Sequence, residues 1–362
     1  MQELSPKKVR PFVAVAIQCE VRAHYYTGKD AKAQRMENVR RYGALLDKFI
    51  PEIGAAQGPE APEIGLVVFP ESFIHGFGKP PVTWEKMQEL AITLPGEETE
   101  VLAEKCREYK VYLAGSCFEC GDPKFPGKIF NTGFILDPEG KVALKYRKIN
   151  TSNNSRELST SPHDVWDQYS HDPEVLFPVL ETPYGNFGMY ICFDANFPEV
   201  ARCVALNGAE ILIRPNNWPR PTVEFLDIMK MHNRMRAYEN SCYLVTCNWA
   251  ASPLSEYEST CAHAMIVDYR GNIVTERIDN VEGFVQTTID VNPLRAMKEK
   301  VYRWNFLMEL RSEVYATAYC SKKCFPPNKY LDPNKNQTGH EEKWEIFRES
   351  IENLKSQRIM RH

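Results

Sequence analysis

The strongest constraint on the fold is an alternation of short apolar segments with helix-like segments, which runs from residue 12 to residue 289. The apolar segments are rich in β-branched and aromatic residues, whereas the helix-like segments repeat apolar residues every three or four positions. This alternation indicates sheets covered by helices, an α/β layered domain. We expect strands at 12–17, 65–69, 111–116, 132–136, 187–191, 211–214, 243–246, 264–268 and 283–289, and helices at 35–50, 99–109, 198–207 and 223–238.

Charge and apolar length exclude two classes of partner. The 44 Lys and Arg residues nearly balance the 48 Asp and Glu residues, whereas nucleic-acid binding needs a concentrated basic surface. No segment approaches the roughly 18–20 apolar residues that cross a bilayer. Lys7, Lys8 and Arg10 precede the apolar segment 12–17 in the order of a signal peptide. Because that segment is short and lacks a small-residue cleavage site, we interpret it as a buried first strand.

The cysteines do not form a recognisable disulfide or metal pattern. Eleven is an odd number for a secreted protein and predicts no small disulfide framework. Cys117 and Cys120 have CxxC spacing, but no second such pair or histidine pair follows at the distance of a zinc site. We therefore expect no structural metal and a reducing, cytoplasmic location.

Two segments depart from the regular alternation. Residues 150–169 are polar, rich in Ser and Asn, and too long for an ordinary connector, so we expect them to be disordered or functional. After residue 292 the composition shifts to charged and aromatic residues. We therefore divide the chain into a main domain, 10–292, and a C-terminal extension, 293–362, with a last helix near 341–354. We expect the extension to wrap the domain or a neighbouring subunit.

Three predicted strands each end at a residue that can take part in catalysis. Glu71 and Cys192 directly follow apolar strands, and Lys148 follows the turn 137–140. Ligands of open α/β sheets collect at the carboxyl ends of strands, and a helix N-terminus after Cys192 is expected to favour its thiolate. Each residue also has an ordinary interpretation, as a packed thiol, a solvated carboxylate or a surface lysine.

Three short motifs resemble those of the nitrilase superfamily of carbon–nitrogen hydrolases, and stand in the same order. They are Phe69-Pro-Glu71, Tyr146-Arg-Lys148 and Ile191-Cys-Phe-Asp194, and similar flanking segments extend the resemblance over about residues 10–290. The resemblance implies a four-layer α-β-β-α sandwich for the carbon–nitrogen hydrolase domain, 10–292. It also implies a homodimer or larger homo-oligomer, and catalysis without a metal or organic cofactor.

The resemblance assigns roles to matching residues. Cys192 corresponds to the nucleophile, Glu71 to the general base and Lys148 to the cation that stabilises the tetrahedral oxyanion, which the backbone N–H of Phe193 would share. Many members use a second glutamate after the lysine. Glu157 is the best match, with a solvated loop carboxylate as the alternative.

A strand adjacent to that of Cys192 ends in Asn216, Asn217 and Trp218. One indole and two amides suit a pocket wall that binds an uncharged amide, although an ordinary turn remains the alternative. His263 is interpreted as a core histidine, or else as a group that titrates near the site.

The motifs give mixed indications of the bond that is cut. Cys192-Phe-Asp194 and residues 197–202 resemble the aliphatic amidase and formamidase branch, whereas residues 69–76 are closer to the nitrilase pattern. We predict an amidase that converts a small carboxamide to acid and ammonia through a Cys192 thioester. The alternatives are a nitrilase, an N-carbamoyl amide hydrolase or, from another class, a non-catalytic assembly subunit.

Overall fold

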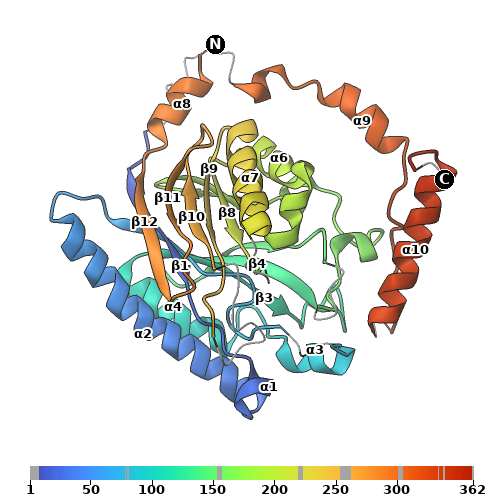
Figure 1. The fold of residues 1–362 in the computed structure, drawn as a ribbon, viewed down its shortest axis with the longest axis horizontal. Helices are drawn as coiled ribbons and strands as arrows, with labels where there is room; N and C mark the ends of the chain where they lie inside the picture. The colour runs from blue at the N-terminus through green and yellow to red at the C-terminus, as the bar shows by residue number, and fades with distance from the viewer. Residues whose placement is uncertain are drawn as a thin grey trace.

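Two six-stranded sheets form the centre of the molecule (Figure 1). The computed structural model describes residues 8–77, 79, 81–152, 157–218, 223–252, 262–300, 305–332, 334–336 and 339–360. The first sheet has the order β12-β1-β2-β3-β4-β5 and the second β11-β10-β9-β8-β7-β6. The strands are β1 Phe12–Gln18, β2 Ile64–Val68, β3 Tyr112–Glu119, β4 Phe130–Leu136, β5 Val142–Arg147, β6 Val179–Thr182, β7 Gly185–Met189, β8 Ile211–Pro215, β9 Tyr243–Cys247, β10 Ala264–Val267, β11 Ile273–Arg277 and β12 Gly283–Ile289.

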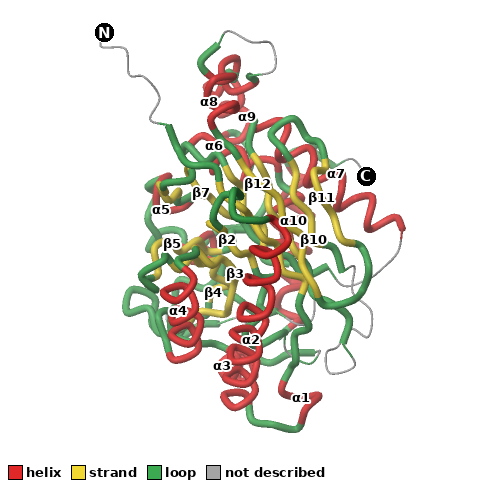
Figure 2. Tube along the Cα trace, turned by 90° about the vertical axis from the view of Figure 1, so that its left-hand side faces the viewer, coloured by secondary structure: helices red, strands yellow, loops and turns green. Residues whose placement is uncertain are grey.

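Helices cover the outer face of each sheet (Figures 1 and 2). Helices α2, Ala31–Gln57, and α4, Glu97–Tyr109, pack together over the first sheet. Helices α6, Pro198–Leu206, and α7, Val223–Asn240, do the same over the second sheet. The predicted four-layer α-β-β-α sandwich is therefore confirmed. Three short helices lie in the connections: α1 His24–Thr27, α3 Trp84–Leu90 and α5 Pro173–Leu176.

The central strands read as continuous apolar runs because both of their faces are buried. In β1, Ala14 and Ala16 belong to the core that includes the second sheet, while Val13 and Val15 belong to the core formed with α2 and α4. Successive side chains of a strand point to opposite faces, so each core takes every second residue. At Gly133 on β4, a Cβ atom would lie only 2.7 Å from Cε of Met189, which explains the glycine.

Parallel pairing brings the reactive strand ends together. β2 pairs in parallel with both β1 and β3, and β8 pairs in parallel with β7 and β9. The segments that follow β2 and β8 meet between the sheets, since the backbone N–H of Glu71 donates to the carbonyl oxygen of Asn216 at 3.3 Å. The candidate site therefore lies where carboxyl ends from the two sheets converge.

The C-terminal extension follows the outside of the domain as an arm (Figure 1). It contains α8 Asn292–Lys298, α9 Ser312–Cys320 and α10 His340–Ser356, so the predicted last helix is present. Parts of the extension pack on the domain of the same chain, whereas contact with a neighbouring subunit stays a prediction. Among the described residues, no helix combines the length and apolar character needed to cross a lipid bilayer.

Candidate active site

A buried ammonium lies between two buried carboxylates. Nζ of Lys148 is 2.7 Å from Oε1 of Glu71 and 3.2 Å from Oε2 of Glu157. None of the three side chains is more than 1% exposed. Asn131, on β4, donates through Nδ2 to both carboxylates, at 2.9 Å each, and Ser159 Oγ donates to Glu157 at 2.7 Å. The structure thus places Glu157 beside Lys148, instead of in a solvated loop.

The carboxylates keep this lysine charged. Burial alone lowers the pKa of Lys148, but the neighbouring charges of Glu157 and Glu71 outweigh burial and hold that pKa above its ordinary value. Burial raises the pKa of Glu157, whereas the charges of Lys148 and Lys343 and the hydrogen bonds from Ser159 and Asn131 bring it below its ordinary value. An ammonium and an ionised Glu157 therefore coexist out of water.

Cys192 lies on a strained turn after β7. It begins the short 3₁₀ helix η2, Cys192–Asn196, and its φ of 42° lies in the left-handed region, which non-glycine residues rarely occupy outside functional sites. Asp194 holds the turn by accepting hydrogen bonds from Ile191 N at 3.1 Å, Asn150 N at 2.9 Å and the Tyr146 hydroxyl at 2.8 Å. These bonds fix the position of the thiol.

The resting thiol is protonated. Burial raises the pKa of Cys192 well above its ordinary value, the Glu71 charge adds to this effect, and Lys148 and Arg214 only partly oppose it. Burial therefore outweighs any contribution that a helix N-terminus makes to the thiolate. The following helical turn is short, and the loss of water around Cys192, a residue that is only 8% exposed, dominates the pKa of the thiol. A base must remove the proton during attack.

The segment after β8 contacts both Glu71 and Cys192. The carbonyl oxygen of Asn216 accepts from Glu71 N, and that of Asn217 accepts from the Cys192 thiol at 3.5 Å. The side-chain Oδ1 atoms of Asn216 and Asn217 are buried without a partner among the described residues. Trp218 is half-buried, and its backbone N–H donates to Asn248 Oδ1 at 3.1 Å. The predicted pocket-wall segment is therefore adjacent to the triad.

Two further predictions can be placed. Phe193 directly follows Cys192 in η2, and its role at the oxyanion stays a prediction. His263 is fully buried, with Nε2 2.9 Å from Glu276 Oε2, and burial lowers its pKa despite that carboxylate. This geometry fits the core histidine of the first interpretation.

Within the segment 150–169, the residues around Glu157 are packed into the protein beside the site. Residues 157–162 are buried, and Thr160 forms an isolated β-bridge with Phe130. Residues 153–156 of this predicted disordered or functional segment lie outside the described residues. The part that carries Glu157 is therefore structured, which favours the functional alternative.

Three polar residues of the site were missed by sequence reasoning. Asn131 bridges the carboxylates, Arg214 donates to the Cys192 carbonyl oxygen at 3.0 Å, and the indole N–H of Trp249 donates to the Glu71 carbonyl oxygen at 2.7 Å. Asn131 and Arg214 interrupt apolar strands and are completely buried. The sequence signal that could have identified these two residues is a polar residue within an apolar strand, because a buried polar group needs a hydrogen-bond partner.

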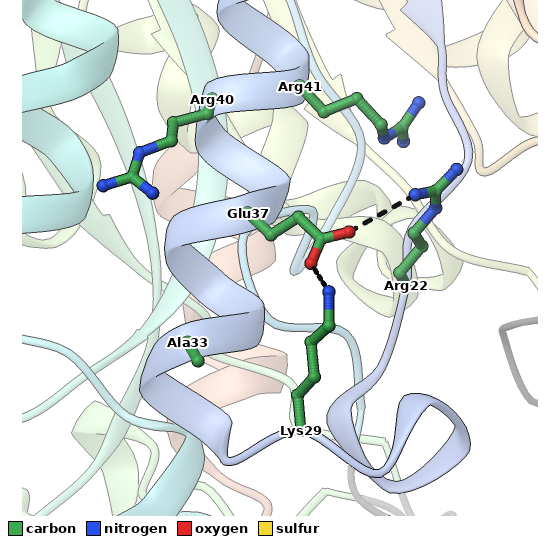
Figure 3. A pocket seen from close by; sticks show the side chains of 6 residues that line it. All are labelled: Arg22, Lys29, Ala33, Glu37, Arg40 and Arg41. Carbon is green, nitrogen blue, oxygen red and sulfur yellow. Dashed lines mark hydrogen bonds and ion pairs between the residues drawn. The ribbon is translucent and has the colours of Figure 1, made fainter.

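The described residues contain no group of three or more His, Cys, Asp or Glu side chains arranged to hold a metal. A separate surface pocket of about 560 Å³ adjoins α2 (Figure 3). In it, Glu37 forms ion pairs with Lys29 and Arg22. The residues that line this pocket include no cysteine, serine or threonine, so it offers no thiol or hydroxyl nucleophile comparable to Cys192.

Comparison with known proteins identifies the family of this chain. The profile of the carbon–nitrogen hydrolase family matches residues 16–299. A formamidase of Bacillus cereus (strain B4264) is 35% identical over 192 residues, and one of Bacillus thuringiensis (strain Al Hakam) is 34% identical over 190. Each match covers 52% of this chain and 51% of the relative, so the chain spans about half the length of these relatives.

Solved structures share the fold. The Saccharomyces cerevisiae protein Nit3, a member of branch 10 of the nitrilase superfamily, has a TM-score of 0.62 with 24% identity over 82% of this chain and 96% of that one. An amidase from Nesterenkonia sp. has a TM-score of 0.60 with 16% identity over 88% and 100%. With the ordered motifs, the buried Glu71–Lys148–Cys192 grouping and the profile match, this chain belongs to the carbon–nitrogen hydrolase family.

Proposed function

We propose that the protein is an amidase that hydrolyses a small carboxamide to a carboxylic acid and ammonia through a thioester on Cys192. The observation that carries the proposal is the buried Lys148 ammonium, held at 2.7 Å by Glu71 and at 3.2 Å by Glu157 beside a protonated thiol. This grouping supplies a nucleophile, a base and a fixed positive charge. We further propose a cytoplasmic homo-oligomer, without nucleic acid or membrane as a partner.

In the attack step, Glu71 takes the thiol proton as Sγ of Cys192 forms a bond to the carbonyl carbon of the amide. The C=O double bond becomes a single bond and its oxygen becomes an oxyanion. The Lys148 ammonium and the Phe193 N–H stabilise that oxyanion, and they act more strongly in the transition state than on the neutral amide.

Glu71 then transfers its proton to the departing nitrogen, the C–N bond breaks and ammonia leaves an acyl thioester. Glu71 next removes a proton from water as the water oxygen attacks the thioester carbon. The C–S bond breaks, the acid leaves and the thiol regains the proton that Glu71 took from water. One amide and one water thus give one acid and one ammonia.

Residues around the triad suit an uncharged substrate. Glu157 holds Lys148 in place, and the unpartnered Oδ1 atoms of Asn216 and Asn217 can accept hydrogen bonds from an amide NH₂ group. The formamidase relatives support a small acyl group, although they match this chain over only about half of their length.

The test is a panel of formamide, acetamide, propionamide, a nitrile and an N-carbamoyl compound, each with ammonia and acid release measured. We expect release from small amides, and trapping of the acyl group on Cys192 as an added mass in the intact protein. Cys192→Ala should abolish turnover and trapping, whereas Cys203→Ala on α6 should retain both. Turnover by Cys192→Ala would exclude the thioester route. A substrate preference for nitriles or carbamoyl compounds would select the alternative activities, and inactivity toward all compounds would favour an assembly subunit.

A further inference from the structure

The C-terminal extension is attached to the segment that carries Glu157. We define the strap as the described residues among 325–336. Its backbone N–H groups at Asn328 and Tyr330 donate to the carbonyl oxygens of His163 and Asp164, at 3.0 and 2.9 Å. Tyr330 is only 2% exposed. The strap therefore packs closely along residues that follow Glu157 in the chain.

A lysine of the domain anchors the strap from the other side. Nζ of Lys128, a residue that is only 3% exposed, donates to the carbonyl oxygens of Asp332 and Lys335, at 2.8 and 2.6 Å, and to Oδ1 of Asn336 at 3.1 Å. These contacts fix the chain just before α10 begins. The start of α10 is thereby held close to the candidate site.

The buried face of α10 contains a lysine where an apolar residue is expected. Lys343, Ile346 and Ser350 follow helical spacing and are 5%, 9% and 9% exposed. Lysine is almost never buried in this way unless it is paired. The ammonium of Lys343 donates to the backbone oxygen of Ser152, in the segment that leads from Lys148 to Glu157. A charge from the extension thus reaches the vicinity of the triad.

Charged groups of the domain influence the pKa of this ammonium. Burial lowers the pKa of Lys343 to about 8, while the charges of Glu157 and Asp164 act to raise it and that of Lys148 acts to lower it. Asp164 is also influenced by Lys128, and burial raises its pKa to about 6. Glu157 shares the Lys148 ammonium with Glu71. Lys343 supplies a second positive charge that acts on Glu157.

We propose that Lys343 is a positioning residue for the reaction: its ammonium, supplied by the C-terminal extension, balances Glu157 so that Lys148 keeps its charge available for the oxyanion. This inference rests on the proposed amidase function, because the oxyanion belongs to that reaction. An uncompensated negative charge near the site disfavours a second negative charge on the substrate oxygen. The extension thereby completes the electrostatics of the candidate site, in addition to covering it.

The test compares Lys343→Met, Lys343→Arg and, as the matched control, Lys355→Met on the same helix. Lys355 is 31% exposed and pairs within α10 with Glu352. We expect Lys343→Met to lower kcat at pH 7 by about tenfold, the effect of about one pKa unit of charge interaction, with a smaller change in KM. Lys343→Arg should restore kcat, and Lys355→Met should leave it unchanged.

The pH profile separates positioning from packing. Wild-type kcat should fall as pH rises through about 8, where Lys343 loses its proton, and Lys343→Arg should move that fall to higher pH. Lys343→Met should lack it, and any loss of Tm in Lys343→Met should be restored in Lys343→Arg, because the loss of one partner of a buried charge interaction is destabilising. If Lys343→Met had the same kcat and the same pH profile as the wild type, the inference would be overturned. A lowered Tm that Lys343→Arg fails to restore would overturn it too.

A second readout does not depend on turnover. The rate at which iodoacetamide alkylates Cys192, followed by peptide mass spectrometry across pH, reports the charge near the thiol. We expect Lys343→Met to shift this profile to higher pH, because a nearby positive charge favours the thiolate. If wild type hydrolyses no compound of the panel, the proposed function fails, and an unshifted alkylation profile would then overturn the placement of Lys343 as well.

Discussion

At the scale of single residues, the site depends on one lysine whose ammonium contacts two carboxylates. Lys148 contacts Glu71 and Glu157, and Asn131 ties the two carboxylates together from the other side of the network. Both acids are buried, so the removal of any one member leaves an unpaired group out of water. The network is consequently rigid, and in the proposed reaction it holds the ammonium where charge develops.

Lys148→Met should lower kcat by about 10²–10³-fold while KM changes little, because a fixed donor to an oxyanion acts mainly in the transition state. Steady-state kinetics on the best amide of the panel measures both constants. Lys145→Met is the matched control, since Lys145 is a half-exposed lysine of β5 that pairs with Glu119. A rise in KM with unchanged kcat would contradict the oxyanion role.

The three motifs predicted which side chains would lie together, and the ordinary chemistry of a thiol predicted that it would need a base, but the extent of burial could not be predicted. The sequence places Cys192 at a strand–helix junction, where a helix N-terminus was expected to favour the thiolate. The structure shows a thiol whose pKa burial raises. Burial depends on the packing of both sheets and is not encoded near position 192. For the same reason Asn131 and Arg214 became recognisable as partners only once their contacts were known.

At the scale of elements, the turn η2 connects the buried sheet to the reactive sulfur. Asp194 is fully buried and accepts hydrogen bonds from two backbone N–H groups and one hydroxyl. A left-handed φ at Cys192 persists only where the surroundings compensate for its strain. Asp194 supplies that compensation and thereby couples folding of the turn to the position of the Cys192 thiol.

Asp194→Ala should lower the free energy of unfolding by about 2–4 kcal/mol, because buried donors lose a charged acceptor. Urea unfolding followed by circular dichroism measures the loss. Asp268→Ala gives a matched comparison, since Asp268 also accepts from backbone N–H groups in a turn, but at the surface. Equal losses in the two variants would argue against a special role for Asp194.

Most strands and the longer helices were predictable because their periodicity survives in the sequence, whereas α1, α3, α5, α8 and α9 were not predicted. Strand β6 was not predicted, and strands β5 and β11 were predicted only as short continuations after tight turns. β6 and β11 are only partly buried, and β5 and β6 lie at the edge of their sheets. Partly exposed strands mix polar and apolar residues, which weakens the pattern. Helix α2 was predicted too short, because Asp30 caps it earlier, through its bond to Ala33 N, and it continues past Pro51.

At the scale of the whole molecule, the extension links distant parts of the chain. The shift in composition after residue 292 indicated where it begins, but no sequence pattern paired Lys343 with Ser152 or Lys128 with the strap. Those pairings join residues from separate regions of the chain and depend on how the arm lies against the domain. Long-range contacts of this kind are the part of the fold that local patterns do not encode.

Removal of the residues after Ser321 should change the number of subunits in the assembly, since we expect the extension to wrap a neighbouring subunit as well as its own domain. Light scattering coupled to size-exclusion chromatography measures the mass of the particle. An unchanged subunit number would refute the wrapping of a neighbour. Full-length Tyr319→Ala serves as a control for surface changes on α9, where Tyr319 is 62% exposed.

The hydrogen bonds from Lys128 to the strap have a consequence for evolution. Two of its three acceptors are main-chain oxygens, which every amino acid possesses. Mutations at positions 332 and 335 can therefore accumulate without loss of those acceptors, whereas a change at position 128 removes the donor. Descendants of a common ancestor should thus retain the lysine long after the strap has diverged beyond recognition, and a search for related arms is better guided by the domain residue than by the arm itself.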